Sequence, residues 1–144
     1  MSRALMATHC PHAQPIGLGV LDNWRFLVTT DGYASIAPAP GARVHGVLWR
    51  LTPRDLAALN AYESVDTGLY RSRTVAVRAS GRRVSALVYI GRAATAGQPK
   101  PGYLDIVLDA AYAWRLPSDY VASLARWMPA GLRSARPPET GELE

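Results

Sequence analysis

The stretch that decides the fold of this chain is Asn60-Ala61-Tyr62-Glu63-Ser64-Val65-Asp66-Thr67-Gly68-Leu69-Tyr70. It joins a predicted helix to a predicted strand, and it contains Glu63, while the three other glutamates all lie beyond residue 138. The helix is expected to begin at Thr52-Pro53-Arg54-Asp55. Threonine is suited to the N-cap, proline to the first helical position and aspartate to the third.

Counting along that helix places Leu56, Leu59 and Glu63 at positions i, i+3 and i+7, which form one apolar face. Glu63 is therefore expected to point toward the core at the C-terminal end of the helix. Loss of hydration and the negative end of the helix dipole would both raise its pKa. A carboxyl with a pKa nearer neutrality suits general acid/base chemistry. The alternative is a frayed helix end at which Glu63 turns to solvent, as most glutamates do.

The length of 144 residues indicates one domain, predicted over residues 1–132, with a disordered tail over 133–144. The composition, 49% hydrophobic and 19% charged, is typical of a soluble globular protein. No apolar run approaches the roughly 20 residues of a membrane span, and no signal peptide is visible, so no membrane partner is expected. The single cysteine, Cys10, excludes an internal disulfide. These features predict a cytoplasmic protein.

The chain is basic, with a formal net charge of +5. Lys100 is the one lysine among 16 basic residues, so the rest are arginines. Because the arginines are dispersed and only Arg82-Arg83 are adjacent, with no zinc spacing and no basic helix, we expect no nucleic-acid partner. The positive charge would favour small anionic substrates by electrostatic steering.

The order of elements predicts an α+β fold, with a small, mostly antiparallel, barrel-like sheet and flanking helices. Strands are expected at 16–21, 24–29, 33–37 and 43–51, with a loop at 38–41. The clearest hairpin pairs 69–79 with 82–91 around Ser80-Gly81. Helices are expected at 2–9, at 103–116 and after Pro117, and a loop rich in glycine, proline and alanine at 92–102.

Several kinds of chemistry lack support in the sequence. There is no Gly-rich phosphate loop and no Gly-x-Ser-x-Gly elbow. His9, Cys10 and His12 lie close together without a fourth ligand at a familiar spacing, so no metal is expected. Cys10 as a nucleophile, with His9, His12 or His45 as its base, stays open without local support. A carboxyl acting with tyrosines, and with no cofactor, is what remains.

At this point the residues resemble the gamma-glutamylcyclotransferase-like family, over Met1 to Leu124. The Tyr-Glu-x-Val block with its trailing Gly-x-Tyr is the most specific part. The matching motifs are Gly32-Tyr33-Ala34-Ser35-Ile36, Val44-His45-Gly46-Val47-Leu48-Trp49, Leu59-x-x-Tyr62-Glu63-x-Val65-x-x-Gly68-x-Tyr70, Pro101-x-Tyr103 and Leu116-Pro117-x-x-Tyr120.

The resemblance implies a barrel-like fold with a central cavity, and enzymes that release 5-oxoproline from gamma-glutamyl amides. The substrate's own alpha-amine attacks its gamma-carbonyl, so no protein nucleophile, metal or cofactor is required. The role of general acid/base falls on Glu63. Tyr70 and, less strongly, Tyr33 are implied as substrate-binding residues, with Tyr89 and Tyr103 as weaker candidates. The loop at 92–102 would help to select the leaving amine.

The sequence departs from the family at its beginning. Family members carry Tyr-Gly-Ser-Asn after their first strand, and the backbone N–H groups of that loop hold the substrate. This chain begins where that motif should have finished. Either the start is placed too far downstream, or the chain lacks the loop. In the second case a sheet edge would be open, which dimerisation would cover.

Two functions follow from these observations. The first is a gamma-glutamyl cyclotransferase-type enzyme acting on a small-molecule gamma-glutamyl substrate. The alternative is a non-catalytic small-molecule binding or interaction domain of the same fold, motivated by the missing motif.

Overall fold

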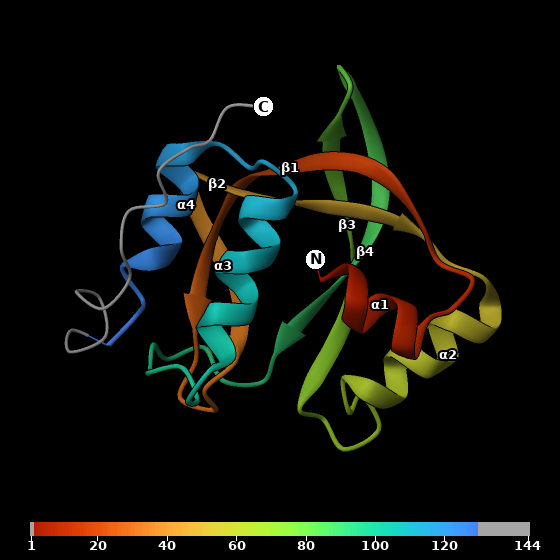
Figure 1. Ribbon diagram of the computed structural model, residues 1–144, viewed down its shortest axis with the longest axis horizontal. Coiled ribbons are helices and arrows are strands. Elements are labelled where there is room, and N and C mark those ends of the chain that lie inside the picture. Colours follow the sequence, from red (N-terminus) through yellow and green to blue (C-terminus); the bar gives the residue numbers. More distant parts are fainter. Residues whose placement is uncertain (1, 130–144) are drawn as a thin grey trace.

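The computed structural model describes residues 2–129 of the chain. Four helices and four strands follow one another in the order shown in Figure 1. The predicted tail at 133–144 lies outside the described residues. The elements are α1 (Arg3–His9), β1 (Gln14–Val28), β2 (Ala34–Arg50), α2 (Pro53–Tyr62), β3 (Tyr70–Ala79), β4 (Arg82–Gly91), α3 (Tyr103–Ala113) and α4 (Ser118–Ala125).

The described strands form one antiparallel sheet in the order β2-β1-β3-β4. The prediction of separate strands at 16–21 and 24–29 and of a loop at 38–41 was wrong, because β1 and β2 run unbroken through both regions. The register between the two strands shifts at this point: Asp22 pairs with Arg43, and Trp24 pairs with Pro38. Asn23 alone therefore faces the stretch at 39–42. Such a bulge adds residues to one strand without ending it, so Pro38 and Pro40 can lie within β2.

The hairpin of β3 and β4 agrees with the sequence prediction. Ser80 and Gly81 occupy the turn with φ values of 49° and 74°. Two consecutive positive φ values are typical of the type I′ turn, whose twist matches that of the paired strands. The pairing then runs without interruption from Ala79 and Arg82 to Tyr70 and Gly91, and the hairpin tip projects from the rest of the molecule (Figure 1).

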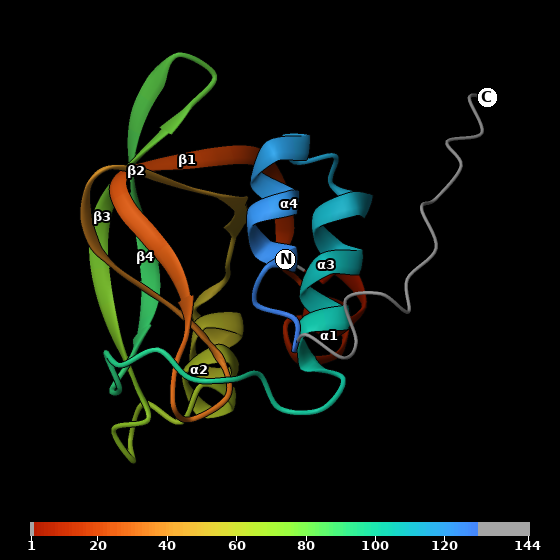
Figure 2. The ribbon, with the colours of Figure 1, turned by 90° about the vertical axis from the view of Figure 1, so that its left-hand side faces the viewer.

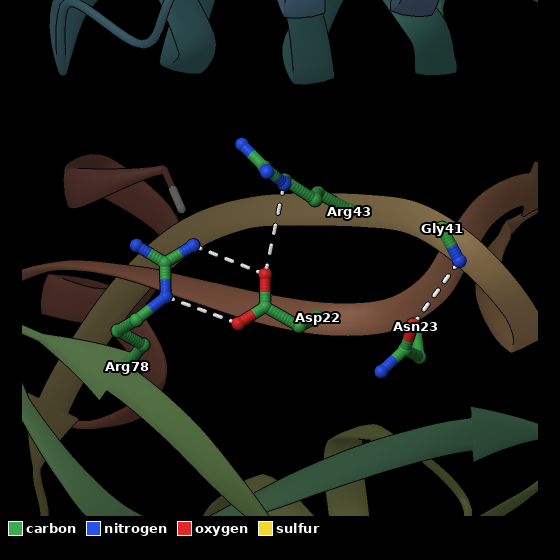
Figure 3. Close-up of polar contacts among 5 residues, drawn as sticks. All are labelled: Asp22, Asn23, Gly41, Arg43 and Arg78. Carbon is green, nitrogen blue, oxygen red and sulfur yellow. Dashed lines mark hydrogen bonds and ion pairs between the residues drawn. The ribbon is translucent and has the colours of Figure 1, made fainter.

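The seam between β1 and β3 is short, with a single pair of facing residues, Val20 and Arg78. An ion pair reinforces it: the Arg78 guanidinium donates two hydrogen bonds of 3.0 Å to the Asp22 carboxylate. Arg43 approaches the same carboxylate from β2 at 3.7 Å (Figure 3). The hydrogen bonds from Arg78 lower the pKa of Asp22. One carboxylate thus ties together three strands at the place where the backbone ladder is weakest.

The sheet curls so that its two outer strands, β2 and β4, approach each other. The Gly91 N–H donates a hydrogen bond of 2.9 Å to the Ser35 hydroxyl, while no ladder joins these strands in the described part of the chain. The curled antiparallel sheet with its helices confirms the predicted fold class.

Helices α3 and α4 pack together beside the sheet (Figure 2) and supply most of the apolar core. Leu104, Leu108 and Leu124 are at most 2% exposed, and Phe26 of β1 meets Trp127 edge-on with ring centroids 6.2 Å apart. The buried residues of both helices, Leu104, Leu108, Ala111, Val121 and Leu124, belong to this core. Helix α3 ends at Ala113, before the predicted Leu116, because Arg115 takes a left-handed conformation (φ 54°).

The segment at 92–102 has no helix or strand, as predicted, and is held against the end of β1. Backbone N–H groups of Thr30, Gly97 and Lys100 donate to carbonyls of Thr95, Val28 and Gly32 at 2.8–3.1 Å. Gly97 permits this contact, because a Cβ there would lie 2.6 Å from the Thr29 oxygen. In residues 2–129, no helix is both long and apolar enough to cross a membrane.

Candidate functional site

Glu63 lies at the C-terminal cap of α2, as the helix count predicted. Thr52 caps the other end, and its side chain and that of Asp55 exchange hydrogen bonds with each other's backbone N–H groups. The Glu63 N–H still donates to the Leu59 carbonyl at 2.9 Å, so the residue is fixed by the last turn of the helix. Its side chain is half-buried, and this burial raises the pKa of Glu63. The structure therefore favours the inward-facing interpretation over a solvent-exposed helix end.

Three tyrosines lie near enough to this carboxyl for its charge to affect them. Burial is the main cause that raises the pKa of each of Tyr70, Tyr89 and Tyr103, and the negative charge of Glu63 raises all three further. They come from three different elements, the starts of β3 and α3 and the end of β4. The fold thus brings together phenols that are far apart in the sequence and a carboxyl with limited access to water.

Tyr70 and Tyr103 both bind the backbone of Ala34. The Tyr70 hydroxyl donates to the Ala34 carbonyl at 2.7 Å, and the Ala34 N–H donates to the Tyr103 oxygen at 3.1 Å. The Tyr33 ring meets the Tyr103 ring edge-on at 5.2 Å. The structure therefore brings both predicted binding residues next to Tyr103: Tyr33 through its ring and Tyr70 through the shared backbone of Ala34. The Tyr70 hydroxyl already donates its proton to the Ala34 carbonyl. The Tyr103 hydroxyl accepts a hydrogen bond there, so its own proton remains available to a ligand.

The sequence reasoning missed Asn60, which joins this cluster from α2. The Tyr89 hydroxyl donates to the Asn60 side-chain oxygen at 2.5 Å, and this bond ties β4 to the helix that carries Glu63. The signal was present in the sequence: Asn60 precedes Glu63 by three residues, so both lie on the same face of the helix.

Cys10 and its neighbouring histidines have structural contacts. The Cys10 thiol donates to the Asp55 carbonyl at 3.4 Å, and the His12 N–H donates to the Asp55 carboxylate at 3.4 Å. Burial, and then the charge of Asp55, raise the pKa of Cys10, which disfavours the thiolate that a nucleophile needs. The His9 ring contacts the Tyr62 ring at a tilt, so Cys10, His12 and His9 all take part in a packed junction between α1 and α2. The His45 ring makes a tilted contact with Tyr120, between β2 and α4.

Within residues 2–129, the structure gathers no group of three or more histidine, cysteine, aspartate or glutamate side chains that could hold a metal ion. The candidate site consists of one half-buried carboxyl, phenolic hydroxyls and backbone amides. Such a set can bind a polar ligand by hydrogen bonds and move a proton to or from it.

Comparison with known proteins points to one family. Residues 43–124 match the AIG2-like family. The chain is 28% identical to the gamma-glutamylcyclotransferase of Mus musculus and 30% identical to that of Homo sapiens, in each case over 94 residues that make up 65% of this chain. A solved structure of a gamma-glutamyl cyclotransferase superposes with a TM-score of 0.80 at 22% identity, covering 98% of this chain and 86% of the other.

The fold and the motif around Glu63 define the gamma-glutamylcyclotransferase class of α+β domains. The chain belongs to the AIG2-like, gamma-glutamylcyclotransferase family, as the sequence motifs indicated. The aligned region spans about half the length of the curated relatives.

Proposed function

We propose that this chain is a gamma-glutamyl cyclotransferase-type enzyme in which Glu63 is the general acid/base. The observation that carries the proposal is a half-buried glutamate of raised pKa among three tyrosines. Distant similarity to curated gamma-glutamylcyclotransferases supports the reaction class. The substrate is a small gamma-glutamyl amide.

The reaction is an intramolecular transfer. The Glu63 carboxylate takes a proton from the alpha-ammonium group, and the neutral amine attacks the gamma-carbonyl carbon. A new C–N bond closes the five-membered ring and leaves two protons on the ring nitrogen. Glu63 gives its proton to the leaving nitrogen and the bond to that amine breaks, while the second proton of the ring nitrogen passes through Glu63 to the departing amine, which leaves as its ammonium form. The products are 5-oxoproline and the amine, so neither water nor a cofactor is consumed. One carboxyl performs both steps because its raised pKa keeps both protonation states accessible.

The tyrosines position the substrate in this proposal. Tyr70 fixes the backbone of Ala34, next to Tyr33, while the Tyr103 hydroxyl is available to donate to the gamma-carbonyl oxygen as negative charge develops there. Tyr33 and Tyr70 are thus retained as binding residues, with Tyr70 acting through the backbone that it holds.

The test is 5-oxoproline release over a panel of gamma-glutamyl amino acids, gamma-glutamylamines and glutathione, compared between the wild type and Glu63→Gln. Loss of a general acid/base lowers the rate by about 10²–10⁴-fold. Asp66→Asn, which removes a nearby exposed carboxylate, is the matched control and should retain the wild-type rate. Circular dichroism checks that both variants fold.

Turnover retained by Glu63→Gln would refute the catalytic role of Glu63. If the wild type binds a gamma-glutamyl compound in calorimetry and releases no 5-oxoproline across the panel, the chain is instead the non-catalytic binding domain that the sequence also allowed.

A further inference from the structure

A cavity of about 420 Å³ lies between the β3–β4 hairpin and strands β1 and β2. Its volume falls within the range of about 300–1,000 Å³ that is typical of small-molecule sites. Glu63 does not line it. The lining residues are Trp24, Ile36, Ala37, Pro38, Gly68, Arg71, Arg73, Ile90, Gly91, Arg92, Ala93 and Ala94.

The alternation of β3 explains how arginines reach this cavity. Arg71 and Arg73 share a face of the strand with Val75 and Val77, because successive side chains point to opposite sides. Val77 is buried at 8% exposure and packs toward β1, so the two arginines continue the inward face of the strand. Tyr70 lies on the opposite face, and neither Tyr70 nor Glu63 lines the cavity.

The cavity is strongly positive. Three arginines and no carboxylate line it. Arg92 is already bound to Asp31, with N···O distances of 3.2 and 3.3 Å. Arg71 and Arg73 have no acidic partner within residues 2–129. Two guanidinium groups, each able to bind a phosphate or carboxylate through paired N–H donors, thus remain available at one cavity.

The cavity also has an apolar lining. The apolar part of this lining comes from Trp24, Ile36 and Ile90 and lies among the arginines: Ile90 pairs with Arg71 across the hairpin, and the Arg73 guanidinium lies 5.3 Å from the centroid of the Trp24 ring. An indole beside a guanidinium provides a flat surface for stacking next to a site for negative charge. We propose that this cavity binds a small organic anion with a flat apolar body and a phosphate or carboxylate head group. Arg71 and Arg73 hold the head group, and Trp24 contacts the body.

Calorimetry at low ionic strength tests this proposal, because the arginines are exposed and salt screens their charge. Adenosine monophosphate and 1-naphthoate are the phosphate and carboxylate probes, and adenosine and inorganic phosphate each lack one half of the ligand. We expect saturable binding of at least one complete probe and binding at least tenfold weaker for adenosine and inorganic phosphate. In ¹H–¹⁵N spectra, the indole N–H of Trp24, assigned with Trp24→Phe, should shift on binding.

Arg71→Gln and Arg73→Gln should each weaken binding by about tenfold or more, since each removes a charged hydrogen-bond donor. Arg82→Gln removes the same charge at the far end of the hairpin and should retain the wild-type affinity. The proposal is overturned if neither complete probe binds saturably, or if Arg82→Gln weakens binding as much as the cavity variants do. The test does not depend on 5-oxoproline release, so its outcome is separate from that of the proposed reaction.

Discussion

At the scale of single residues, Glu63 carries opposing demands of stability and function. Burial raises its pKa, so the folded state binds the proton more tightly than the unfolded state does. The folded state therefore loses stability as the pH rises through the unfolded and then the folded pKa, and at neutral pH the ionised side chain destabilises the fold. A natural protein retains a destabilising carboxyl of this kind where its function requires it.

Glu63→Gln is therefore expected to raise the melting temperature at pH 7, while the same substitution lowers turnover by about 10²–10⁴-fold. The difference between variant and wild type should shrink below about pH 4, where the wild-type carboxyl is protonated in both states. Thermal unfolding from pH 3.5 to 8 measures it. A variant that is less stable than the wild type at pH 7 would contradict the burial argument.

The same raised pKa predicts the acidic side of the pH profile. If Glu63 takes the proton from the alpha-ammonium, kcat/KM should fall as the pH drops through the pKa of Glu63, and the midpoint should lie above the ordinary glutamate value of about 4.3. Initial rates of 5-oxoproline release between pH 4 and 8 give the midpoint. A profile without an acidic limb in this range would count against the assignment.

At the scale of elements, the bulge between β1 and β2 depends on one residue. Asn23 takes a left-handed conformation (φ 65°), and its side-chain oxygen accepts the Gly41 N–H at 3.1 Å (Figure 3). Residues other than glycine, asparagine and aspartate pay a steric cost there. The bulge thus allows two long strands to remain paired around a stretch with two prolines.

Asn23→Ala should lower the free energy of unfolding by about 1–2 kcal/mol, because alanine is strained in this conformation and cannot accept the Gly41 bond. Asn23→Gly is the matched comparison: it loses the bond and tolerates the conformation, so it should cost less. Urea unfolding of the two variants separates strain from hydrogen bonding. If both variants lost the same free energy of unfolding, the left-handed conformation of residue 23 would contribute nothing to the cost.

At the scale of the whole molecule, the core between α3 and α4 supports the site. Tyr103 begins α3, and its hydroxyl accepts the Ala34 N–H. Leu108→Ala should reduce the free energy of unfolding by about 2–5 kcal/mol, because this side chain is 2% exposed in the centre of the core. Leu87→Ala, on the exposed face of β4, should change it by much less. If both substitutions reduced the free energy of unfolding by similar amounts, the contact between α3 and α4 would not be the main core.

The sequence by itself determined the features that depend on near neighbours. Thr52 and Asp55 exchange hydrogen bonds across three residues, and Ser80-Gly81 closes a two-residue turn. The position of Glu63 at the end of a helix follows from counting turns, and the family follows from short motifs around it. Each is decided by local geometry, which sequence patterns record directly.

Only the tertiary structure decided the features that join distant segments. The hydroxyls of Tyr70 and Tyr103 meet one alanine that lies 36 and 69 residues away along the chain, and the bulge that joins the predicted strand pieces depends on pairing between β1 and β2. The arginine-lined cavity forms because the sheet curls and brings β4 toward β2. No local pattern encodes these contacts, since they arise from the packing of the whole chain around one core.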